Sequence, residues 1–472
     1  MCKHTTTDKG RKWYDSAHAS LCMLGSYLCA VAFFRPIEEG VKIKQKVLKY
    51  TPVQKLEMLF VALLAGAKAV YQTGTTLRVD PAMQMAFGLP GCAEQSVIAD
   101  TLDAATEEDV VALRHAIATI FRQHSQAQHH DFAKEPLILD IDLSPLPASS
   151  KAEGSERGYM GRSRSKTGRK LVRVRASQYQ ETVHEDVLLG RTAESLTVLQ
   201  EAVQQAERLL GLDGESVAAR AKRDRTEIRL DSGWGGEEMI NWLLLRGYQV
   251  TGKFKSNSRV QKLVKPVEKW EGTSSPGREV AAVPSPVVLA RPTHQYAVRT
   301  PSKDKPGGYY HAVLLTTRLE LTMLEVVERY DERAGMESDL KGDKRGLGLA
   351  TLRKHKLAAQ KIVVLLVGLA HNVLVWARGW LAKRAPRLEG FGIVRLVQQV
   401  WAVPGRVKVV GEKLKRLRLN PKHPQAQDVS TGLSGLLLEG QTIGFLGQIL
   451  AAGAKTITVI FSTGGPPSSG MQ

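Results

Sequence analysis

The chain has 472 residues, and its 66 lysines and arginines outnumber its 47 aspartates and glutamates, which gives a formal net charge of +19. Its hydrophobic content of 43% excludes wholesale disorder, and its length suggests roughly three domains. The basic excess favours a polyanionic partner, which leaves nucleic acid and an anionic membrane surface as candidates.

Two apolar segments decide between these partners, because a helix needs about 20 apolar residues to span a bilayer. Residues 21–34 and 362–376 are both shorter than this, and the second contains His371 and Asn372. We therefore expect two buried helices, no membrane partner and a nucleic-acid partner. The four cysteines form no CxxC pair, which argues against a zinc finger or a disulfide framework and favours a reducing cytoplasm.

The N-terminal part of the chain is predicted to be helical. Apolar residues recur at helical spacing in residues 52–71, 94–102 and 107–121. We expect residues 1–133 to form a helical N-terminal domain.

Alternating short apolar runs and helical stretches follow from residue 137 onwards. Strands are predicted at residues 137–142, 171–176, 182–189, 226–230 and 248–252, and helices at residues 192–210 and 237–245. The first strand is expected to close at a Ser-Pro pair, and the first helix to end before Gly211. This order, β-β-β-α-β-α-β, predicts an α/β fold with a mixed sheet flanked by helices, and it is also the order of an RNase H-like core.

Residues 254–318 interrupt this core with Pro, Gly and Ser clusters and short extended runs, which predicts a β-rich insertion. Helices are then expected at residues 321–339 and 352–381. The predicted domains are a helical N-terminal domain (1–133), a core in two parts (134–253 and 319–385), the insertion (254–318), a C-terminal basic region (386–439) and a tail (440–472).

Three acidic positions are candidates for chemistry. Asp140 and Asp142 lie on one face of the first predicted strand, so that either could be the functional residue. Asp231 ends a strand before a glycine-rich turn, and Glu337 lies on a predicted helix about 106 residues later. Converging carboxylates could hold hard divalent cations such as Mg²⁺, which leave coordination positions for water and phosphate oxygens.

A polar stripe surrounds the last of these positions, because Tyr330, Arg333, Glu337, Lys341 and Lys344 are spaced by 3, 4, 4 and 3 residues. Such a stripe is either a solvated helix face or a metal ligand flanked by phosphate-binding donors. Two basic runs, residues 162–175 and 406–422, allow the same two readings, a solvated face or contacts to a DNA backbone.

The pattern Tyr330-x2-Arg333-x3-Glu337-x6-Lys344 resembles the Tyr-Arg-Glu-Lys signature of bacterial insertion-sequence DDE transposases. The segments LDIDLS around Asp142 and RLDSGWGGEEMINWLLLRGYQV around Asp231 are similar to the regions of that family's two aspartates. The resemblance covers roughly residues 50–435. It departs from the family in one respect, because Ser144 stands where a threonine usually follows the first aspartate.

This resemblance implies an RNase H-like catalytic core that binds two Mg²⁺ or Mn²⁺ ions through Asp142, Asp231 and Glu337, with Asp140 as the rival to Asp142. The remaining implied site residues contact DNA: they are Tyr330, Arg333, Lys341 and Lys344, with Trp270 as a residue that either stacks on a flipped base or simply packs.

The implied activity is cleavage of transposon ends, which frees a 3′-OH that then joins to target DNA. The implied partners are terminal inverted repeats, bound partly by the N-terminal domain, target DNA and a second copy of the chain, in the cytoplasm at the nucleoid. Two alternatives are an inactive protein that binds transposon ends and a structure-selective nuclease on the same type of core.

Overall fold

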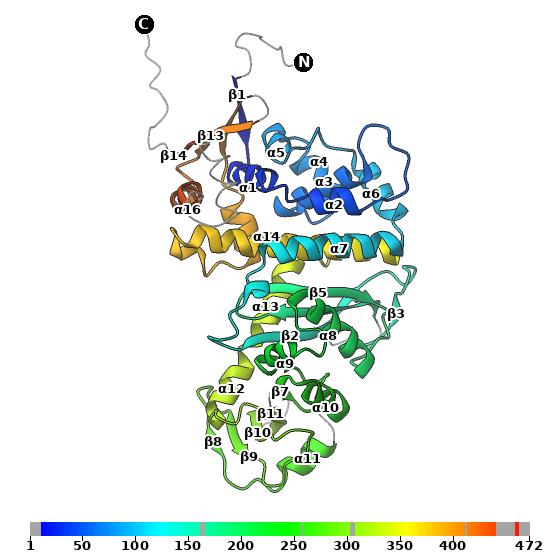
Figure 1. The fold of residues 1–472 in the computed structure, drawn as a ribbon, viewed down its shortest axis with the longest axis vertical. Helices are drawn as coiled ribbons and strands as arrows, with labels where there is room; N and C mark the ends of the chain where they lie inside the picture. Colours follow the sequence, from blue (N-terminus) through cyan, green and yellow to red (C-terminus); the bar gives the residue numbers. More distant parts are fainter. Residues whose placement is uncertain are drawn as a thin grey trace. The chain divides into compact units, whose positions relative to one another are not determined.

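The structure, a computed structural model, is shown in Figure 1. It describes residues 11–160, 166–255, 258–302, 307–410, 413–439 and 458–461. The chain divides into two compact units. We call the continuous segment Ser125–Leu340 the sheet unit, and Met1–His124 together with Lys341–Gln472 the two-segment unit. Most of the predicted tail, 440–472, and part of the first basic run, 162–165, lie outside the described residues.

The sheet unit is built on one large mixed sheet. In the described part of the chain its strands are β2 (Leu137–Pro147), β3 (Glu156–Arg157), β4 (Thr167–Ala176), β5 (Glu181–Leu188), β6 (Thr226–Leu230), β7 (Gln249–Lys253), β8 (Glu271–Gly272), β9 (Glu279–Ala282), β10 (His294–Pro301) and β11 (Tyr309–Thr316). The order β5-β4-β2-β6-β7 has antiparallel pairs up to β2 and parallel pairs from β2 to β7. This is the arrangement expected of an RNase H-like core, so the predicted α/β fold class is confirmed.

The first core strand is longer than predicted. β2 runs through Pro145 to Pro147, although the Ser-Pro pair was expected to end it at residue 142. Prolines are tolerated here because β6 pairs only with Leu137–Ile141, so the later part of β2 has β4 alone as its neighbour. The strand therefore carries Asp142 beyond the end of its parallel partner.

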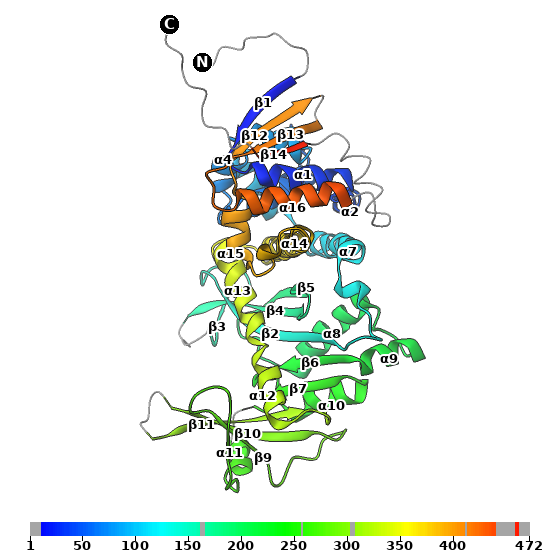
Figure 2. The same ribbon diagram turned by 90° about the vertical axis from the view of Figure 1, so that its left-hand side faces the viewer.

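Helices cover the core sheet on both sides. They are η1 (Ala127–His129), α8 (Leu196–Leu210), α9 (Val217–Asp224), α10 (Glu237–Arg246), α11 (Ser258–Val264) and α12 (Met323–Asp331). Figure 2 shows α8, α9 and α10 on one side of the sheet and α12 on the other. As predicted, α8 ends before Gly211, which adopts a left-handed conformation with a φ of 65°. α9 and α11 were not predicted.

The helix predicted at 321–339 is two helices. α12 begins at Met323, after the N-cap residue Thr322, whose side chain forms a reciprocal capping box with Glu325. It ends at Asp331, and α13 (Ala334–Gly346) follows after a tight turn. In this turn the backbone N–H of Arg333 donates to the carbonyl of Tyr330 at 3.1 Å, a three-residue bond in place of the α-helical four. The polar stripe is therefore not one face of a continuous helix.

The β-rich segment 254–318 extends the core sheet. β11 pairs antiparallel with β7, placing Leu315 opposite Gly252, and β10 and β9 continue outward from β11. Residues 286–289, in the segment expected to hold short extended runs, form no strand. An apolar cluster joins these added strands to α12, and its buried members are Val280, Tyr296, Val298, Leu314, Val326 and Val327, with Tyr330 packed against them.

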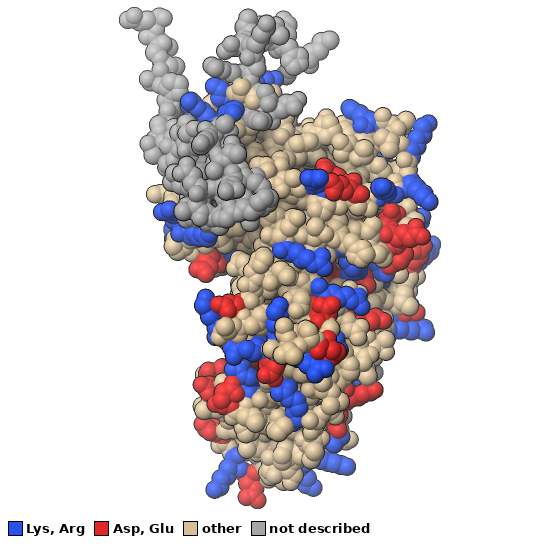
Figure 3. All heavy atoms as spheres, viewed as in Figure 1, with Lys and Arg blue, Asp and Glu red and all other residues tan. Residues whose placement is uncertain are grey.

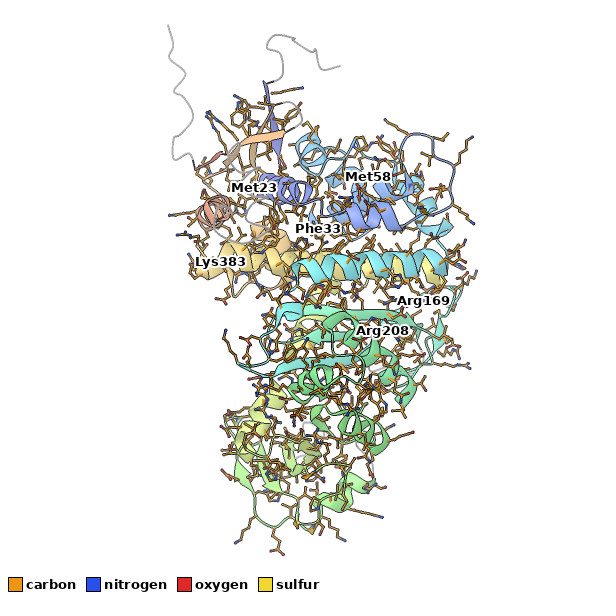
Figure 4. The ribbon with its side chains drawn as sticks, viewed as in Figure 1. Met23, Phe33, Met58, Arg169, Arg208 and Lys383 are labelled. Carbon is orange, nitrogen blue, oxygen red and sulfur yellow. The ribbon has the colours of Figure 1, made fainter. Side chains whose placement is uncertain are left out.

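The two-segment unit is mainly helical. Its helices are α1 (Ala19–Ala30), α2 (Arg35–Gly40), α3 (Pro52–Leu64), α4 (Gln72–Thr76), α5 (Pro81–Ala86), α6 (Gln95–Ala104), α7 (Glu107–His124), α14 (Leu357–Ala382), η2 (Pro386–Leu388), α15 (Ile393–Arg395), the π-helix η3 (Leu396–Val400) and α16 (Ala426–Glu439). Phe33 and Met58, both labelled in Figure 4, are buried among them. α3 ends seven residues before the predicted end, because Gly66 turns the chain with a φ of 86°.

A small sheet completes this unit and was not predicted. β1 (Arg11–Ser16) pairs antiparallel with β12 (Gly405–Val410), which pairs with β13 (Lys413–Leu419), and β14 (Thr458–Phe461) lies parallel to β13. The expectation that residues 1–133 are helical is therefore wrong for β1. Its partner lies almost 400 residues away, so no local pattern could indicate the pairing.

The apolar segments expected to be buried helices are α1 and α14. Of the described helices, α14 alone is long and apolar enough to cross a membrane by length and composition, but 89% of its most apolar window is buried. His371 lies in this buried stretch and contacts the carboxylate of Asp343 at 2.8 Å through Nδ1. The helix serves here as the centre of a core.

Glu57 on α3 is an acid buried in this apolar core. It is 6% exposed, and its Oε1 has no hydrogen-bond partner within the described part of the chain. Burial raises the pKa of Glu57 to about 8, and the nearby Glu38 adds to the effect. Because the folded pKa is above the unfolded value of 4.5, the folded state retains this proton to higher pH. The stability that this retained proton gives the folded state is therefore lost as the pH rises from about 4.5 to about 8.

We expect Glu57→Gln to stabilise the protein at pH 8 by roughly 1–3 kcal/mol and to have little effect at pH 5, since glutamine keeps the shape without the charge. Thermal unfolding of wild type and variant at both pH values measures this. The matched control is Glu108→Gln, an exposed position on α7. An equal shift of the midpoint at pH 5 and pH 8 would show that Glu57 is not the titrating group.

Candidate active site at the ends of two parallel strands

Asp142 and Asp231 occupy equivalent positions relative to two neighbouring parallel strands, β2 and β6. Ile141 of β2 lies opposite Leu230 of β6, and each aspartate is the next residue of its chain segment. Oδ1 of Asp231 accepts hydrogen bonds from the backbone N–H groups of Gly233 at 3.0 Å and Trp234 at 3.4 Å. These bonds fix the carboxylate at the start of the loop after β6.

Gly235 allows this loop to turn close to the next strand. A Cβ atom there would lie 2.0 Å from the carbonyl oxygen of Lys253, at the end of β7. The sequence predicts a glycine-rich turn after Asp231. The structure shows that Gly235 is needed for close backbone packing, since its φ is not in the left-handed region.

Arg333 brings a guanidinium to the two aspartates. It is 6% exposed, and its Nη2 donates to the carbonyl of Ile141 at 2.8 Å and to Oδ1 of Asp142 at 3.3 Å. Burial opposes its charge, but the attraction of Asp231 and Asp142 raises the pKa of Arg333 overall. Its Nε has no hydrogen-bond partner among the described residues. The tight turn after α12 thus presents a cation to both carboxylates.

Asp231 is held in an environment that disfavours its charge. Burial is the main cause that raises its pKa, Asp142 and Glu194 add to the rise, and Arg333 opposes it. Tyr330 belongs to the same group, because burial raises its pKa to about 12 and both Arg333 and Asp231 act on it. Four of the predicted site residues therefore lie together: Asp142, Asp231, Tyr330 and Arg333.

Asp140, the rival first carboxylate, has a different environment. It is fully buried and accepts hydrogen bonds from Nε and Nη2 of Arg229, at 2.7 and 3.0 Å. Arg175 adds a contact through Nη1 at 3.4 Å. The Asp142 side chain is 16% exposed and has one arginine contact. Asp140 thus has the surroundings of a structural ion pair, and Asp142 is the more accessible of the two.

Glu337 differs from the two aspartates in its exposure. It lies on the first turn of α13 and is exposed, whereas Asp142 and Asp231 are partly buried at the strand ends. Within the described ranges, no group of three His, Cys, Asp or Glu side chains is placed to hold a metal ion. The three-carboxylate metal site that the resemblance implies therefore stays a prediction.

Lys341 and Lys344 lie further along α13, in the two-segment unit, where Lys341 is exposed and Lys344 is half-buried.

Two charged residues near the aspartates, Glu194 and Lys253, were not predicted, and a third, Lys170, belongs to the first basic run. Glu194 approaches Gly233, where an added Cβ would meet its carboxyl carbon at 2.8 Å, and its charge acts on Asp231. Lys253 ends β7, and the charge of Asp231 acts on its pKa, which burial lowers. Lys170 is likewise buried near Asp142 and Glu194, and burial lowers its pKa. The available signal for Lys253 was its place at the end of the strand parallel to β6.

Trp270, the candidate base-stacking residue, is half-buried at β8. The guanidinium of Arg299 lies 4.4 Å from its ring centroid and 4.6 Å from that of Tyr309. Arg299 also donates to Glu279 at 2.5 Å. Trp270 borders a cavity of about 530 Å³, together with Val280, Met323 and other residues. A cation thus stacks on the indole, and both roles expected of Trp270, base stacking and packing, stay predictions.

The first basic run was expected to be a solvated face or a DNA contact, and both readings are wrong for its described arginines from Arg169 to Arg175. Arg169, labelled in Figure 4, is fully buried and donates to the carbonyl of Glu153 at 2.7 Å. Arg173 pairs with Glu185 at 2.7 Å, and Arg175 pairs with Asp339 at 2.5 Å. Lys170, also buried, donates to the carbonyl of Tyr159. On the face shown in Figure 3, cationic and acidic side chains are interleaved over the sheet unit.

No family model matches the chain, and no curated protein matches it. Among solved structures, a cryo-EM structure of a piggyBac transposase synaptic complex with hairpin DNA is similar over 94% of this chain and 87% of that chain. The sequence identity is 11% and the TM-score 0.41. A likeness at this level carries no inference about function.

Proposed function

We propose that the chain is a DNA transposase that cuts transposon ends and joins them to target DNA. The observation that carries the proposal is the contact between Arg333 and Asp142, 191 residues apart in sequence, beside Asp231. These residues come from all three segments on which the resemblance to DDE transposases rests. Their meeting at one edge of an RNase H-like sheet supports a common role.

The arrangement suits work on a phosphodiester. Asp142 and Asp231 provide carboxylate oxygens, and Arg333, Lys253 and Lys170 provide cations around them. A guanidinium recognises phosphate through its planar set of donors, and ammonium groups add positive charge. In the proposed reaction, hydrolysis of the phosphodiester at each transposon end frees a 3′-OH, and that hydroxyl then attacks a target strand.

A requirement for two divalent ions, Mg²⁺ or Mn²⁺, is part of the proposal. Oxygen donors such as Asp142 and Asp231 are those that Mg²⁺ prefers. Glu337 is proposed as the third ligand on its sequence spacing alone. The further proposed partners are terminal inverted repeats, target DNA and a second copy of the chain, in the cytoplasm at the nucleoid.

A second candidate function is binding of transposon ends without cleavage. The observation that favours it is that, among the described residues, no three His, Cys, Asp or Glu side chains are placed to hold a metal ion. A third reading, a structure-selective nuclease, has no residue in its favour beyond the shared site.

The test is cleavage by the purified full-length protein of a linear duplex that carries inverted repeats from the DNA flanking the gene. Cutting at the repeat ends with Mg²⁺, and none with EDTA, is the expected result on a denaturing gel. Binding without any cleavage would establish the second candidate. Cleavage of branched DNA regardless of the repeat sequence would establish the nuclease.

We expect Glu337→Gln to reduce cleavage by about 10³-fold while binding to the repeats is retained, because a carboxylate ligand is lost without a change in shape. The matched variant is Glu194→Gln, the same replacement at the acid that lies beside Asp231. Cleavage rate and binding are measured for both. If Glu337→Gln cuts normally and Glu194→Gln does not, the third carboxylate is Glu194.

A further inference from the structure

The outer face of the small sheet in the two-segment unit is strongly basic. In the antiparallel register, Trp13 lies opposite Lys408, and Lys408 lies opposite Arg416. Two pairs further along, Asp15 lies opposite Arg406, and Arg406 lies opposite Arg418. Residues opposite each other share a face, and so do residues two apart on one strand. These six residues, which we call the basic face, therefore project from the same side.

The other side of these strands is apolar and buried. Val407, Val409, Leu414, Leu417 and Leu419 are 0–7% exposed, and α1 packs near β12 and β13. By contrast, Arg406, Arg416 and Arg418 are exposed, and Lys408 is half-buried. The sheet thus buries its apolar side in the core and leaves the basic face for solvent.

The cations of the basic face are crowded around one indole. Arg418, Arg406 and Lys408 lie 5.0, 5.8 and 5.9 Å from the ring centroid of Trp13. Asp15 is the one carboxylate of the face, and it contacts Arg406 at 3.2 Å with its own side chain 87% exposed. Four cations against one exposed acid leave a net charge of +3 in a small area, and like charges this close repel one another.

The segments that adjoin β1 and β14 in sequence carry little acidic charge. Residues 440–472 contain no aspartate or glutamate, and residues 1–10 contain one aspartate and two lysines. The charge of the basic face is therefore available to an external polyanion.

We propose that the basic face binds the phosphate backbone of duplex DNA. A row of cations across neighbouring strands presents separate donors to successive phosphates, and counterion release then drives binding. A membrane is the less suitable partner, because interfacial binding needs apolar side chains to insert. The exposed large hydrophobic residues of the described chain include none from β1, β12 or β13.

This inference goes beyond the proposed function. The basic face belongs to the two-segment unit, uses none of the residues of the candidate active site, and requires no cleavage. It assigns sequence-independent DNA binding to residues outside the signature on which the resemblance rests.

The test is a quadruple variant of the full chain, Arg406→Gln, Lys408→Gln, Arg416→Gln and Arg418→Gln, in fluorescence-anisotropy titrations with a random-sequence duplex at several salt concentrations. We expect affinity at 0.1 M salt to fall roughly 100-fold, and the slope of log K against log salt to shrink by about 3–4. The control removes four exposed cations elsewhere, Arg208, Arg220, Arg225 and Lys262, with the same change in net charge. An equal loss in the control would overturn the proposal, since net charge alone would then explain it.

Asp15→Asn provides the opposite change and keeps the proposal testable if the quadruple variant does not fold. Removing the one acid of the face is expected to tighten duplex binding about 2–5-fold. Unchanged or weaker binding would contradict the proposal. Vesicles of anionic lipid form the last arm: loss of vesicle binding with unchanged DNA binding in the quadruple variant would assign the face to a membrane instead.

Discussion

Replacing Asp231 by asparagine is expected to abolish cleavage of transposon-end DNA, by about 10³-fold or more, while the folded protein becomes no less stable. The two effects differ in sign because burial and the neighbouring Asp142 and Glu194 raise the pKa of Asp231. An acid with a raised pKa costs the folded state free energy when it is ionised, and asparagine removes that cost. Cleavage rates and thermal unfolding at pH 7.5 measure the two quantities.

Loss of cleavage without loss of stability is the result expected for a functional carboxylate, because functional groups are commonly held at the expense of stability. Asp213→Asn, at an exposed position between α8 and α9, is the matched control and should change neither quantity. Normal cleavage by Asp231→Asn would remove this residue from the site. A large fall in unfolding temperature would instead show that its carboxylate is structural.

Asp140→Asn should behave in the opposite way and destabilise the protein by about 3–5 kcal/mol. The replacement leaves the buried guanidinium of Arg229 without its full partner, and an uncompensated buried charge is costly. Arg175, which contacts Asp140 and Asp339, loses part of its pairing as well. Thermal unfolding of Asp140→Asn and Asp142→Asn, measured side by side, compares the same chemical change two residues apart.

The variants Asp140→Asn and Asp142→Asn also show which aspartate is the first functional carboxylate. We expect Asp142→Asn to unfold near the wild-type temperature and to lose cleavage. If Asp140→Asn folded as stably as wild type and lost cleavage while Asp142→Asn kept it, the assignment would have to be exchanged. A folded, active Asp140→Asn would show that the ion pair with Arg229 contributes less than its burial indicates.

Local patterns predicted much of the core sheet unit. The strands β5, β6 and β7 and the helices α8 and α10 have apolar periodicity within single segments, so each was located within a few residues. Gly211 indicated the end of α8 because its left-handed conformation is one that glycine adopts at little cost. The position of Asp142 and Asp231 at strand ends followed from the same patterns.

Pairings between distant residues could not be predicted. Arg173 and Arg175 look like a solvated basic run because their acidic partners are on another strand or, for Asp339, 164 residues away. The break between α12 and α13 was also not predicted, because the residue spacing alone is compatible with one continuous helix. Only the contacts of Arg333 with β2 show why the chain turns there.

The discontinuous make-up of the two-segment unit has a consequence for the order in which the chain folds. β1 is synthesised about 390 residues before β12, the strand with which it pairs. At roughly 5–20 residues per second, this interval lasts roughly 20–80 s. The sheet unit is continuous and is complete by Leu340, so it can form on the ribosome first. The candidate active site would then be folded before β12, the strand that pairs with β1, has been synthesised.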